Sequence, residues 1–413
     1  MKVEIREHHT TSVRHQPTHD AGCRAATFAA VRVLMLSWEY PPLVVGGIAA
    51  HVEGLARAMQ AGGNEVVVCS MHHPDEPDDT VVHGVRVLRA DPGLPWLPDD
   101  DLVALMASAN HQLVQLVAQL GDWQPDIVHA HDWLVAWAGD TIKTLLGVPL
   151  VATVHATERG RHGGHLPPGL PGTINSVEWW LNYQAREVIA CSRFMVREVI
   201  QNFELPAEKV HLVPNGVDTE RWRKPTTAPA SSREPLVMAW GRIQYEKGFQ
   251  VLARAIGELR PLVPGIRCVI AGRGSYLPEL QTQIDMESVS DIVQLAGFVP
   301  DDELHGLLQR AICVVIPSLY EPFGIVALEG MAAGAPTIVA RTGGLAEIVD
   351  GTDAGMLFEP GNHHELADRI AEVVADPSAA DRMRANAASL LRKTYTWDAI
   401  AAETVEVYRI ALT

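Results

Sequence analysis

Residues 312–349 read I-C-V-V-I-P-S-L-Y-E-P-F-G-I-V-A-L-E-G-M-A-A-G-A-P-T-I-V-A-R-T-G-G-L-A-E-I-V. Their order of apolar runs, prolines and glycines predicts a strand, a loop, a helix, a second strand, a glycine turn and a second helix. We expect the strands over 312–316 and 337–340, with Gly334 as the C-cap of the helix between them. The stretch therefore predicts an open α/β sheet, in which ligands bind at the carboxyl ends of the strands.

Two carboxylates follow the first of these strands, Glu321 in the loop and Glu329 on the helix. Two acids that reach one crevice suggest recognition of sugar hydroxyl groups. The segment also offers the backbone N–H groups of Phe323, Gly324 and Ile325 at a helix N-terminus, where an anion or a sugar oxygen can be bound. Either acid alone would be a solvated surface group; the flanking P-S-x-x-E-P-F-G and T-G-G favour a binding site.

The string E-P-F-G-I-V-A-L-E resembles the E-x7-E motif of retaining, nucleotide-sugar-dependent glycosyltransferases with the GT-B fold. The resemblance extends from about Val31 to the C-terminus. It implies an α/β protein of two Rossmann-like domains that face each other across a cleft, with a C-terminal helix that crosses back to the first domain.

Composition agrees with a two-domain enzyme. A chain of 413 residues is long for one domain and fits two α/β domains of ordinary size. The formal net charge of -17 disfavours nucleic acid as a partner. No apolar run approaches the roughly 18 residues of a membrane span. The five cysteines are scattered without C-x-x-C spacing, and four of them lie in or beside apolar strand-like runs, which indicates buried thiols in a reducing cytoplasm.

The domain boundaries follow from patterning. Residues 1–30 lack the apolar core of a signal peptide, so we expect a flexible extension that is dispensable for folding and activity. An acceptor-side domain is expected over 31–222, a linker rich in Pro, Thr, Ala and Ser over 223–235, and a nucleotide-sugar domain over 236–393. The final helix is expected over 394–413.

A first strand at 31–37 runs through W-E-Y-P-P-L-V-V-G-G into a helix over 48–61. The glycines Gly46 and Gly47 could cradle a phosphate, or could simply form a tight turn. The pattern is not G-x-G-x-x-G, which disfavours a dinucleotide site. The string resembles the N-terminal signature of starch and glycogen synthases, and this implies that the second glycine approaches the donor diphosphate.

The acids at 99–101 superficially supply the D-x-D of metal-dependent transferases. Their position at the start of a predicted helix indicates an N-terminal cap instead. We therefore expect no metal at this place.

Two more strands end in polar residues. H-A-H-D-W-L places Asp132 after a strand at 126–130, where it resembles the acid of the H-D-W element near the reacting sugar; it could also cap the helix that follows. His155 ends a strand at 148–155. A lone strand-end histidine is more often structural, but the resemblance implies that His155 hydrogen-bonds the donor sugar. The glycine- and proline-rich loop after it suits closure over an acceptor.

The second domain begins with a strand at 236–240 and continues as G-R-I-Q-Y-E-K-G. Arg242 and Lys247 thus share a strand-end loop, next to a helix that begins at Phe249, and two such cations suit a diphosphate. A surface salt bridge between Lys247 and Glu246 is the alternative. The string also matches the phosphate-binding pair of the glycosyltransferase family.

The remaining donor contacts come from later strand ends. The resemblance places Gly272, Arg273, Phe298 and Val299 beside the nucleotide base. The backbone N–H groups of the turn that starts with Thr342 and Gly343 can bind a phosphate. Trp179 and Trp180 are a plausible platform for the acceptor.

The resemblance implies transfer of glucose from a nucleoside diphosphate glucose, UDP-glucose before ADP-glucose, with retained configuration. The acceptor would be an α-(1→4)-glucan or a methylglucose lipopolysaccharide. No cofactor or metal is expected, because Arg242 and Lys247 would stabilise the leaving phosphate. The alternatives are a maltose-1-phosphate-forming glucosyltransferase, a GDP-mannose-dependent mannosyltransferase acting on a lipid, and a nucleotide-sugar binding protein without activity.

Overall fold

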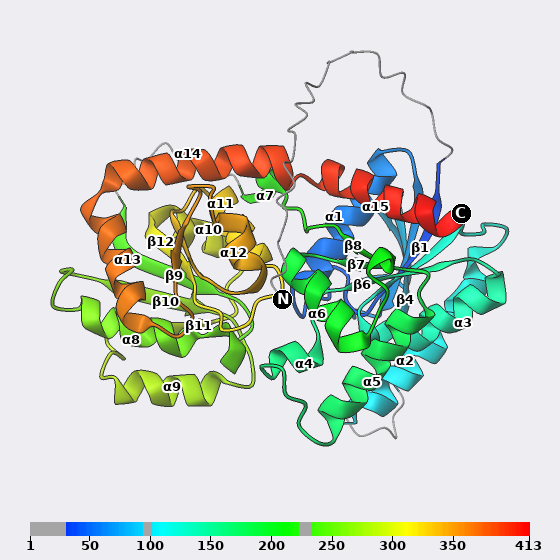
Figure 1. The fold of residues 1–413 in the computed structure, drawn as a ribbon, viewed down its shortest axis with the longest axis horizontal. Helices are drawn as coiled ribbons and strands as arrows, with labels where there is room; N and C mark the ends of the chain where they lie inside the picture. The colour runs from blue at the N-terminus through cyan, green and yellow to red at the C-terminus, as the bar shows by residue number, and fades with distance from the viewer. Residues whose placement is uncertain (1–29, 94–100, 223–232) are drawn as a thin grey trace, which may run out of the picture. The chain divides into compact units, whose positions relative to one another are not determined.

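The computed structural model describes residues 30–93, 101–222 and 233–413. They contain two sheets, of eight strands in the order β3-β4-β2-β1-β5-β6-β7-β8 and of six in the order β11-β10-β9-β12-β13-β14. All neighbouring strands are parallel apart from β3 and β4. Figure 1 shows the helices that surround each sheet.

The strands of the first sheet are β1 (Arg32–Ser37), β2 (Glu65–Met71), β3 (Asp79–Val82), β4 (Val85–Ala90), β5 (Ile127–His131), β6 (Leu150–Val154), β7 (Glu187–Ala190) and β8 (Val210–Leu212). Its helices are α1 (Gly47–Ala61), α2 (Leu102–Leu116), α3 (Ala136–Leu146), α4 (Glu158–Arg161), α5 (Leu170–Gln184), α6 (Arg193–Phe203) and α7 (Thr219–Trp222).

The strands of the second sheet are β9 (Glu234–Trp240), β10 (Arg267–Ala271), β11 (Val293–Gly297), β12 (Ala311–Ile316), β13 (Thr337–Ala340) and β14 (Met356–Phe358). The helices that follow its strands are α8 (Phe249–Leu259), α9 (Leu277–Met286), α10 (Asp301–Arg310), α11 (Ile325–Ala332), α12 (Gly343–Val349), α13 (His363–Ala375), α14 (Pro377–Thr394) and α15 (Trp397–Leu412).

Both faces of each sheet are apolar because successive strand residues point in opposite directions. In β1, Leu34 and Leu36 belong to the core that includes α2 and α3, whereas Val33 and Met35 belong to the core that includes α1 and α15. In β9 the even positions face α10 and α11, and the odd positions face α8 and α13.

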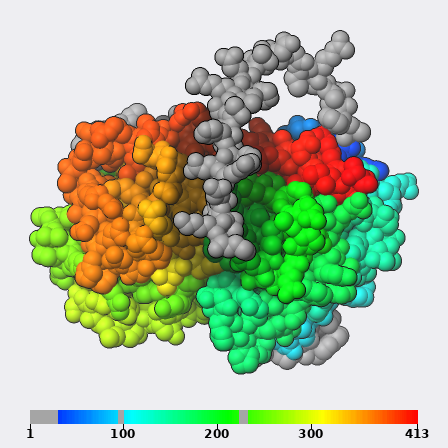
Figure 2. All heavy atoms as spheres, in the orientation of Figure 1, coloured from blue at the N-terminus to red at the C-terminus, as the bar shows by residue number. Residues whose placement is uncertain are grey.

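The last helix of the chain packs on the first sheet. α14 lies against α11, whereas α15 lies against α1 and contacts β6 and β7. Buried Ile400 and Tyr408 of α15 join Val52 and Met59 of α1 in one core. In the space-filling view the outer surfaces of α14 (orange) and α15 (red) are exposed (Figure 2). The expected α/β architecture with a returning C-terminal helix is confirmed.

Most predicted strands are present with small shifts of their ends, but some details differ. β3 and β14 were not predicted. β9 begins at Glu234, inside the predicted linker, and Arg233 before it is buried and donates to the carbonyl oxygens of Leu308, Ala311 and Gly334. The predicted extension up to residue 29, residues 94–100 and residues 223–232 lie outside the described residues. Within the described residues, no helix is both long and apolar enough to span a membrane.

Four of the five cysteines lie among the described residues, and all four are buried free thiols, as the sequence predicts: Cys69, Cys191, Cys268 and Cys313.

Candidate active site

Lys247 and Glu321 form an ion pair between the loops that follow β9 and β12. The Nζ atom of Lys247 lies 2.8 Å from Oε2 of Glu321, and the hydroxyl of Ser318 donates to the same oxygen at 3.0 Å. The strands are neighbours, so their carboxyl ends bring the two loops together. The alternative ion pair with Glu246 is therefore wrong; instead the carbonyl oxygen of Glu246 accepts the N–H groups of Leu319 and Tyr320.

These loops pack backbone against backbone at two glycines. Gly248 has φ 70°, and a Cβ there would overlap the carbonyl of Pro317. Gly343 has φ 49°, and a Cβ there would overlap the carbonyl of Glu321. Any other residue would be strained at both positions and would push the loops apart.

The turn at Thr342 offers fewer free N–H groups than the sequence suggested. The N–H of Thr342 donates to Ala340 at 2.8 Å, and that of Gly344 donates to Glu321 at 3.0 Å. Among the described residues, only the N–H of Gly343 in this turn has no such partner. Of the N–H groups in this turn that were predicted to bind a phosphate, that of Gly343 therefore remains available. Phe323 and Gly324 directly precede α11, which begins at Ile325. The start of α11 therefore follows the loop of Glu321, whose carbonyl oxygen accepts the N–H of Gly344.

The glycine loop before α1 already binds a carboxylate. Oε2 of Glu39 accepts the N–H groups of Val45 and Gly46, at 2.6 Å and 2.7 Å. The sequence analysis quoted Glu39 within W-E-Y-P-P but gave it no role. Burial raises the pKa of Glu39, while its two N–H bonds act in the opposite direction. The N–H of Gly46 is therefore already bonded to an acid of the chain, and the approach of Gly47 to a donor diphosphate stays a prediction.

This glycine loop contacts the second sheet's loops. A Cβ added at Gly46 would lie 3.7 Å from Nε of Arg242, and one added at Gly47 would lie 3.2 Å from Cδ1 of Ile325. Four residues predicted from separate stretches of sequence thus come together. They form the point where the two sheets' strand ends meet.

Arg242 is poised for an anion. Burial lowers the pKa of Arg242, and the positive charge of Arg161 in α4 lowers it further. Among the described residues, no group forms a hydrogen bond or ion pair with its side chain. Two neighbouring guanidinium groups favour a multiply charged anion such as a diphosphate. Arg161 was missed, although it belongs to the R-G-R string after His155.

Asp132 supports His155 through the backbone. Its Oδ1 accepts the N–H of His155 at 2.9 Å, and it makes no side-chain bond to the turn at Trp133–Val135. The predicted helix cap is therefore wrong. Asp132 has φ 63°, an uncommon conformation for a residue other than glycine. Burial raises the pKa of Asp132 to about 6, although the N–H of His155 and the charge of Arg161 oppose the rise.

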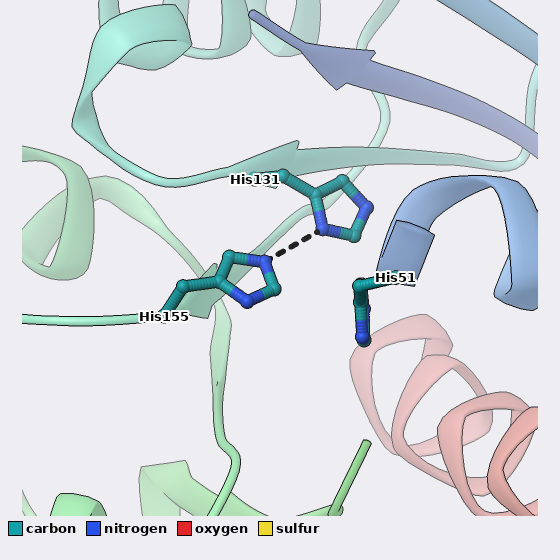
Figure 3. A group of neighbouring side chains, drawn as sticks. All are labelled: His51, His131 and His155. Carbon is teal, nitrogen blue, oxygen red and sulfur yellow. Dashed lines mark hydrogen bonds between the residues drawn. The ribbon is translucent and has the colours of Figure 1, made fainter. Parts of the chain in front are cut away.

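His155 belongs to a group of histidines (Figure 3). Its Nε2 lies 3.3 Å from Nδ1 of His131, and the ring of His51 lies beside both. Burial holds the pKa of all three rings below the usual value, and that of His155 falls to about 3. The three imidazoles are therefore neutral near pH 7. The sequence placed His131 at this strand end without a role and did not single out His51.

Glu329 lies on α11, apart from the Lys247–Glu321 pair. Its Oε2 accepts the indole N–H of Trp240 at 3.3 Å. Burial raises the pKa of Glu329 to about 7, and the indole N–H and the charge of Arg221 act against the rise. This carboxyl group can therefore accept or donate a hydrogen bond near neutral pH.

The loops after β10 and β11 lie side by side. The N–H of Gly272 donates to the carbonyl of Gly297 at 2.7 Å. The guanidinium carbon of Arg273 lies 5.5 Å from the ring centroid of Phe298, whose side chain is 66% exposed, while Val299 is half-buried. An exposed aromatic ring with a cation above it can stack on a flat base.

Comparison with known proteins agrees with this arrangement. Residues 45–221 match the model of glycosyltransferase family 4, and residues 219–390 match that of the glycosyl transferases group 1. A glycogen synthase from Mycobacterium tuberculosis is 37% identical over 401 residues, which cover 92% of this chain and 95% of that protein. The chain belongs to the glycogen synthase-like glycosyltransferases.

Two further proteins resemble this glycosyltransferase. An alpha-maltose-1-phosphate synthase from Mycolicibacterium smegmatis is 28% identical over 403 residues, covering 92% of this chain and 99% of that one. The structure of sucrose-phosphate synthase from Thermosynechococcus elongatus matches with a TM-score of 0.77 at 23% identity, over 92% of this chain and 98% of that chain. The latter likeness concerns the fold and confirms the GT-B prediction.

The loop after His155 is attached to the second sheet of the glycosyltransferase. The hydroxyl groups of Thr157 and Tyr320 both donate to Oε1 of Glu198, the latter at 2.8 Å. The N–H of Thr157 donates to the hydroxyl of Tyr320 at 3.4 Å. The anchor extends into α4, where a Cβ at the buried Gly160 would overlap Tyr320 and Glu198. Of the predicted acceptor platform, Trp179 is 42% exposed and stacks on Tyr183, and Trp180 is half-buried.

A hollow of about 440 Å³ lies away from this site, lined by residues that include Lys143, Arg186 and Thr413. Its lining precedes β6 and β7, at the amino ends of these strands. The predicted residues of the glycosyltransferase lie at the carboxyl ends, where open α/β sheets bind ligands.

Proposed function

We propose that this glycosyltransferase moves glucose from a nucleoside diphosphate glucose, UDP-glucose in the first place, to an α-(1→4)-glucan, with retained configuration. The supporting observation is the Lys247–Glu321 ion pair in the loops of the second sheet, whose residues Arg242 and Ile325 lie against Gly46 and Gly47. Cations held at a helix N-terminus and strand ends suit a diphosphate, and adjacent carboxyl groups suit sugar hydroxyls. The relative named glycogen synthase supports a glucan acceptor.

In this proposal the leaving phosphate takes the proton of the acceptor hydroxyl on the face where the bond breaks. Arg242 and Lys247 stabilise the growing negative charge on that phosphate. His155, held by Asp132, bonds a hydroxyl of the transferred sugar, and Glu321 orients both Lys247 and the sugar. Glu329 binds the ribose hydroxyls. No side-chain nucleophile takes part.

We propose further that neither a metal nor a cofactor is required. The charge of Lys247 and Arg242 would take the place of the divalent cation that D-x-D enzymes bind between the phosphates. Asp101, the one acid of 99–101 that lies among the described residues, accepts the N–H of Ala104 as the N-cap of α2. Activity that EDTA abolishes and Mg²⁺ or Mn²⁺ restores would contradict this part.

A second candidate is synthesis of maltose 1-phosphate from glucose 1-phosphate. It is supported by the relative of that name and by Arg161, a cation on the acceptor side that a phosphorylated acceptor could contact. A methylglucose lipopolysaccharide is a further candidate acceptor for the same site.

A panel of donors and acceptors tests these proposals. UDP-, ADP- and GDP-glucose and GDP-mannose are each offered with maltooligosaccharides, methylglucose polysaccharide and glucose 1-phosphate, and the product is digested with a linkage-specific α-glucosidase. We expect transfer from UDP-glucose and a product that α-(1→4)-specific digestion degrades. Transfer only from GDP-mannose, or none from any donor that binds, would overturn the proposal in favour of a mannosyltransferase or a nucleotide-sugar binding protein.

A further inference from the structure

Three histidines from three elements of the first sheet surround one point, His51 of α1, His131 at the end of β5 and His155 after β6 (Figure 3). One ring nitrogen of each can be chosen so that the three atoms lie within 4.8 Å of one another. The ring centroid of His51 lies 5.3 Å from that of His131 and 4.7 Å from that of His155. Each imidazole can therefore reach a shared ligand with small rotations of its side chain.

Several of these ring nitrogens are buried without a hydrogen-bond partner. Nε2 of His131 and both nitrogens of His51 lack a partner of good hydrogen-bond geometry among the described residues, although the side chain of Asn215 acts on the pKa of His51 as a hydrogen-bonding neighbour. An unsatisfied buried polar group costs about 1–3 kcal/mol. A bound ligand that pairs with these nitrogens would remove this cost, so unpaired buried nitrogens indicate a binding site.

A neighbouring histidine shows the satisfied alternative. His129 stands in the same layer, with its ring centroid 4.1 Å from that of His131. Its Nδ1 and Nε2 both have partners at 2.7 Å, the hydroxyls of Tyr408 and Thr153. The fold thus satisfies both nitrogens of His129. In contrast, Nδ1 of His131 is paired with His155, while Nε2 of His131 and both nitrogens of His51 have no hydrogen-bond partner among the described residues.

The spacing of two of the nitrogens suits a tetrahedral metal. Nδ1 of His131 and Nε2 of His155 are 3.3 Å apart. Two ligands at the roughly 2.05 Å of a zinc–nitrogen bond have this separation when their angle at the metal is about 107°.

We propose that His51, His131 and His155 form a site for a divalent transition metal ion of the zinc class, and that an ion bound there inhibits sugar transfer. Water would fill the fourth position. The inhibitory part rests on the proposed function, because it assumes that His155 bonds the donor sugar. A metal on His155 removes that bond.

Access to the site passes through His155. His51 and His131 are 3% and 1% exposed, whereas His155 is half-buried. A bound donor covers this approach. Donor and metal are therefore expected to exclude each other.

The first test measures binding alone, on the full chain. Wild type, His51→Gln and His131→Gln are titrated with Co²⁺ by visible absorption and with Zn²⁺ by calorimetry, after circular dichroism has shown that each variant is folded. We expect a tetrahedral Co²⁺ spectrum in wild type, and a loss of affinity of at least roughly 10–100-fold in either variant, the range seen for weaker, outer-shell changes.

Two control variants report binding elsewhere. His364→Gln removes a ligand from the second cluster, Glu258, His363 and His364. His8→Gln/His9→Gln removes the histidine pair near the start of the chain. Both are expected to keep the tetrahedral spectrum. Loss of the spectrum in a control variant, or its survival in both His51→Gln and His131→Gln, overturns the proposed site.

The second test measures inhibition. We expect micromolar-range Zn²⁺ titrations to inhibit wild type, UDP-glucose to protect it, EDTA to restore it, and His51→Gln to need more Zn²⁺ for the same fractional inhibition. Metal binding without any effect on transfer would overturn the inhibitory role alone. If no donor in the panel is turned over, the proposed function fails, and the binding test still decides the metal site.

Discussion

Lys247 is placed where negative charge grows as the glycosidic bond breaks in the proposed reaction. Such charge is stabilised more in the transition state than in the ground state, so loss of the ammonium lowers kcat as well as raising KM. We expect Lys247→Ala to lose about 3 kcal/mol of transition-state stabilisation, on the order of a hundredfold in rate. Lys247→Arg keeps the charge but displaces it, and an intermediate rate is expected.

Steady-state kinetics with saturating acceptor checks this, and Lys393→Ala, which removes an exposed lysine of α14, is the control. A higher KM of Lys247→Ala with unchanged kcat would make the lysine a ground-state anchor and leave Arg242 as the stabilising group.

The two acids of the E-x7-E string are expected to have separate roles. Glu329, bonded to Trp240, is proposed to bind ribose, so Glu329→Ala weakens binding of UDP itself. Glu321 pairs with Lys247 and is proposed to bind the transferred sugar, so Glu321→Ala is expected to abolish transfer and to leave most UDP affinity. Calorimetric titration with UDP, beside a transfer assay, separates the two. Equal losses of UDP affinity in both variants would refute the division.

The sequence predicted residues of the site only where they belong to a recognisable motif. Lys247, Glu321 and Glu329 belong to such motifs and were predicted. Glu39 was not, because a single loop acid carries no signal until the fold places it against Val45 and Gly46. An acid seven residues before a glycine turn could have suggested this contact. His51 lies on an ordinary amphipathic helix, and only the neighbouring strands reveal its role.

At the scale of elements, α12 connects the donor-side turn to the first sheet. Glu347 of α12 accepts the N–H groups of Arg193 and Phe194 at 2.9 Å and 2.6 Å, at the start of α6. The hydroxyl of Ser192 donates to the carbonyl of Pro322 at 2.6 Å. The start of α6 thus holds both α12 and the loop that contains Glu321.

We expect Glu347→Ala to lower the free energy of unfolding by about 1–2 kcal/mol, since a charged acceptor at a helix N-terminus is lost. Because the variant also frees the turn at Gly343, KM for the donor rises more than kcat falls. Urea unfolding and steady-state kinetics measure the two effects. The control is Glu303→Ala, which removes an exposed acid of α10. Equal changes of unfolding free energy and donor KM in both variants would show that Glu347 does not connect α12 to the start of α6.

Strands were predicted well where they are central and apolar. β13 has the predicted bounds and β12 begins one residue before its predicted start, because both faces of these strands are covered and the apolar run is continuous. β3 was missed because it is an antiparallel edge strand whose side chains are exposed or half-buried. β14 has three residues, too few for any period to show.

At the scale of the whole molecule, residues 31–413 form one unit by their contacts, and the candidate site draws on both sheets. Gly46 and Gly47 come from the first, Arg242 and Ile325 from the second. No single stretch of sequence predicts such a contact, since it depends on how two sheets built from distant strands meet. The proposed domain bounds, and the dispensability of residues 1–30, stay predictions.

The same assembly buries acids and histidines whose opposite pKa shifts shape stability against pH. The lowered pKa of His155, about 3, means that the unfolded chain binds more protons than the folded chain below the usual histidine value near 6.5. That contribution to stability is therefore present above pH 6.5 and is lost as pH falls. Buried acids with raised pKa values have the opposite effect: they lower the free energy of unfolding as the pH rises.

Among these buried acids, Glu178 of α5 has the strongest effect on stability at alkaline pH. Burial, then the charge of Asp132, raises the pKa of Glu178 from 4.5 to about 9, although its Oε1 accepts the N–H of Glu158 at 2.8 Å. Between these values the folded chain holds a proton that the unfolded chain has released, so the free energy of unfolding falls as pH rises through the window.

Glu178→Gln keeps the acceptor oxygen and cannot ionise. We expect its melting temperature to exceed that of wild type by a margin that grows from pH 5 to pH 9, while the exposed-acid variant Glu279→Gln follows wild type. A difference in melting temperature between Glu178→Gln and wild type that stays constant from pH 5 to pH 9 would show that the Glu178 carboxyl is not held protonated by the fold.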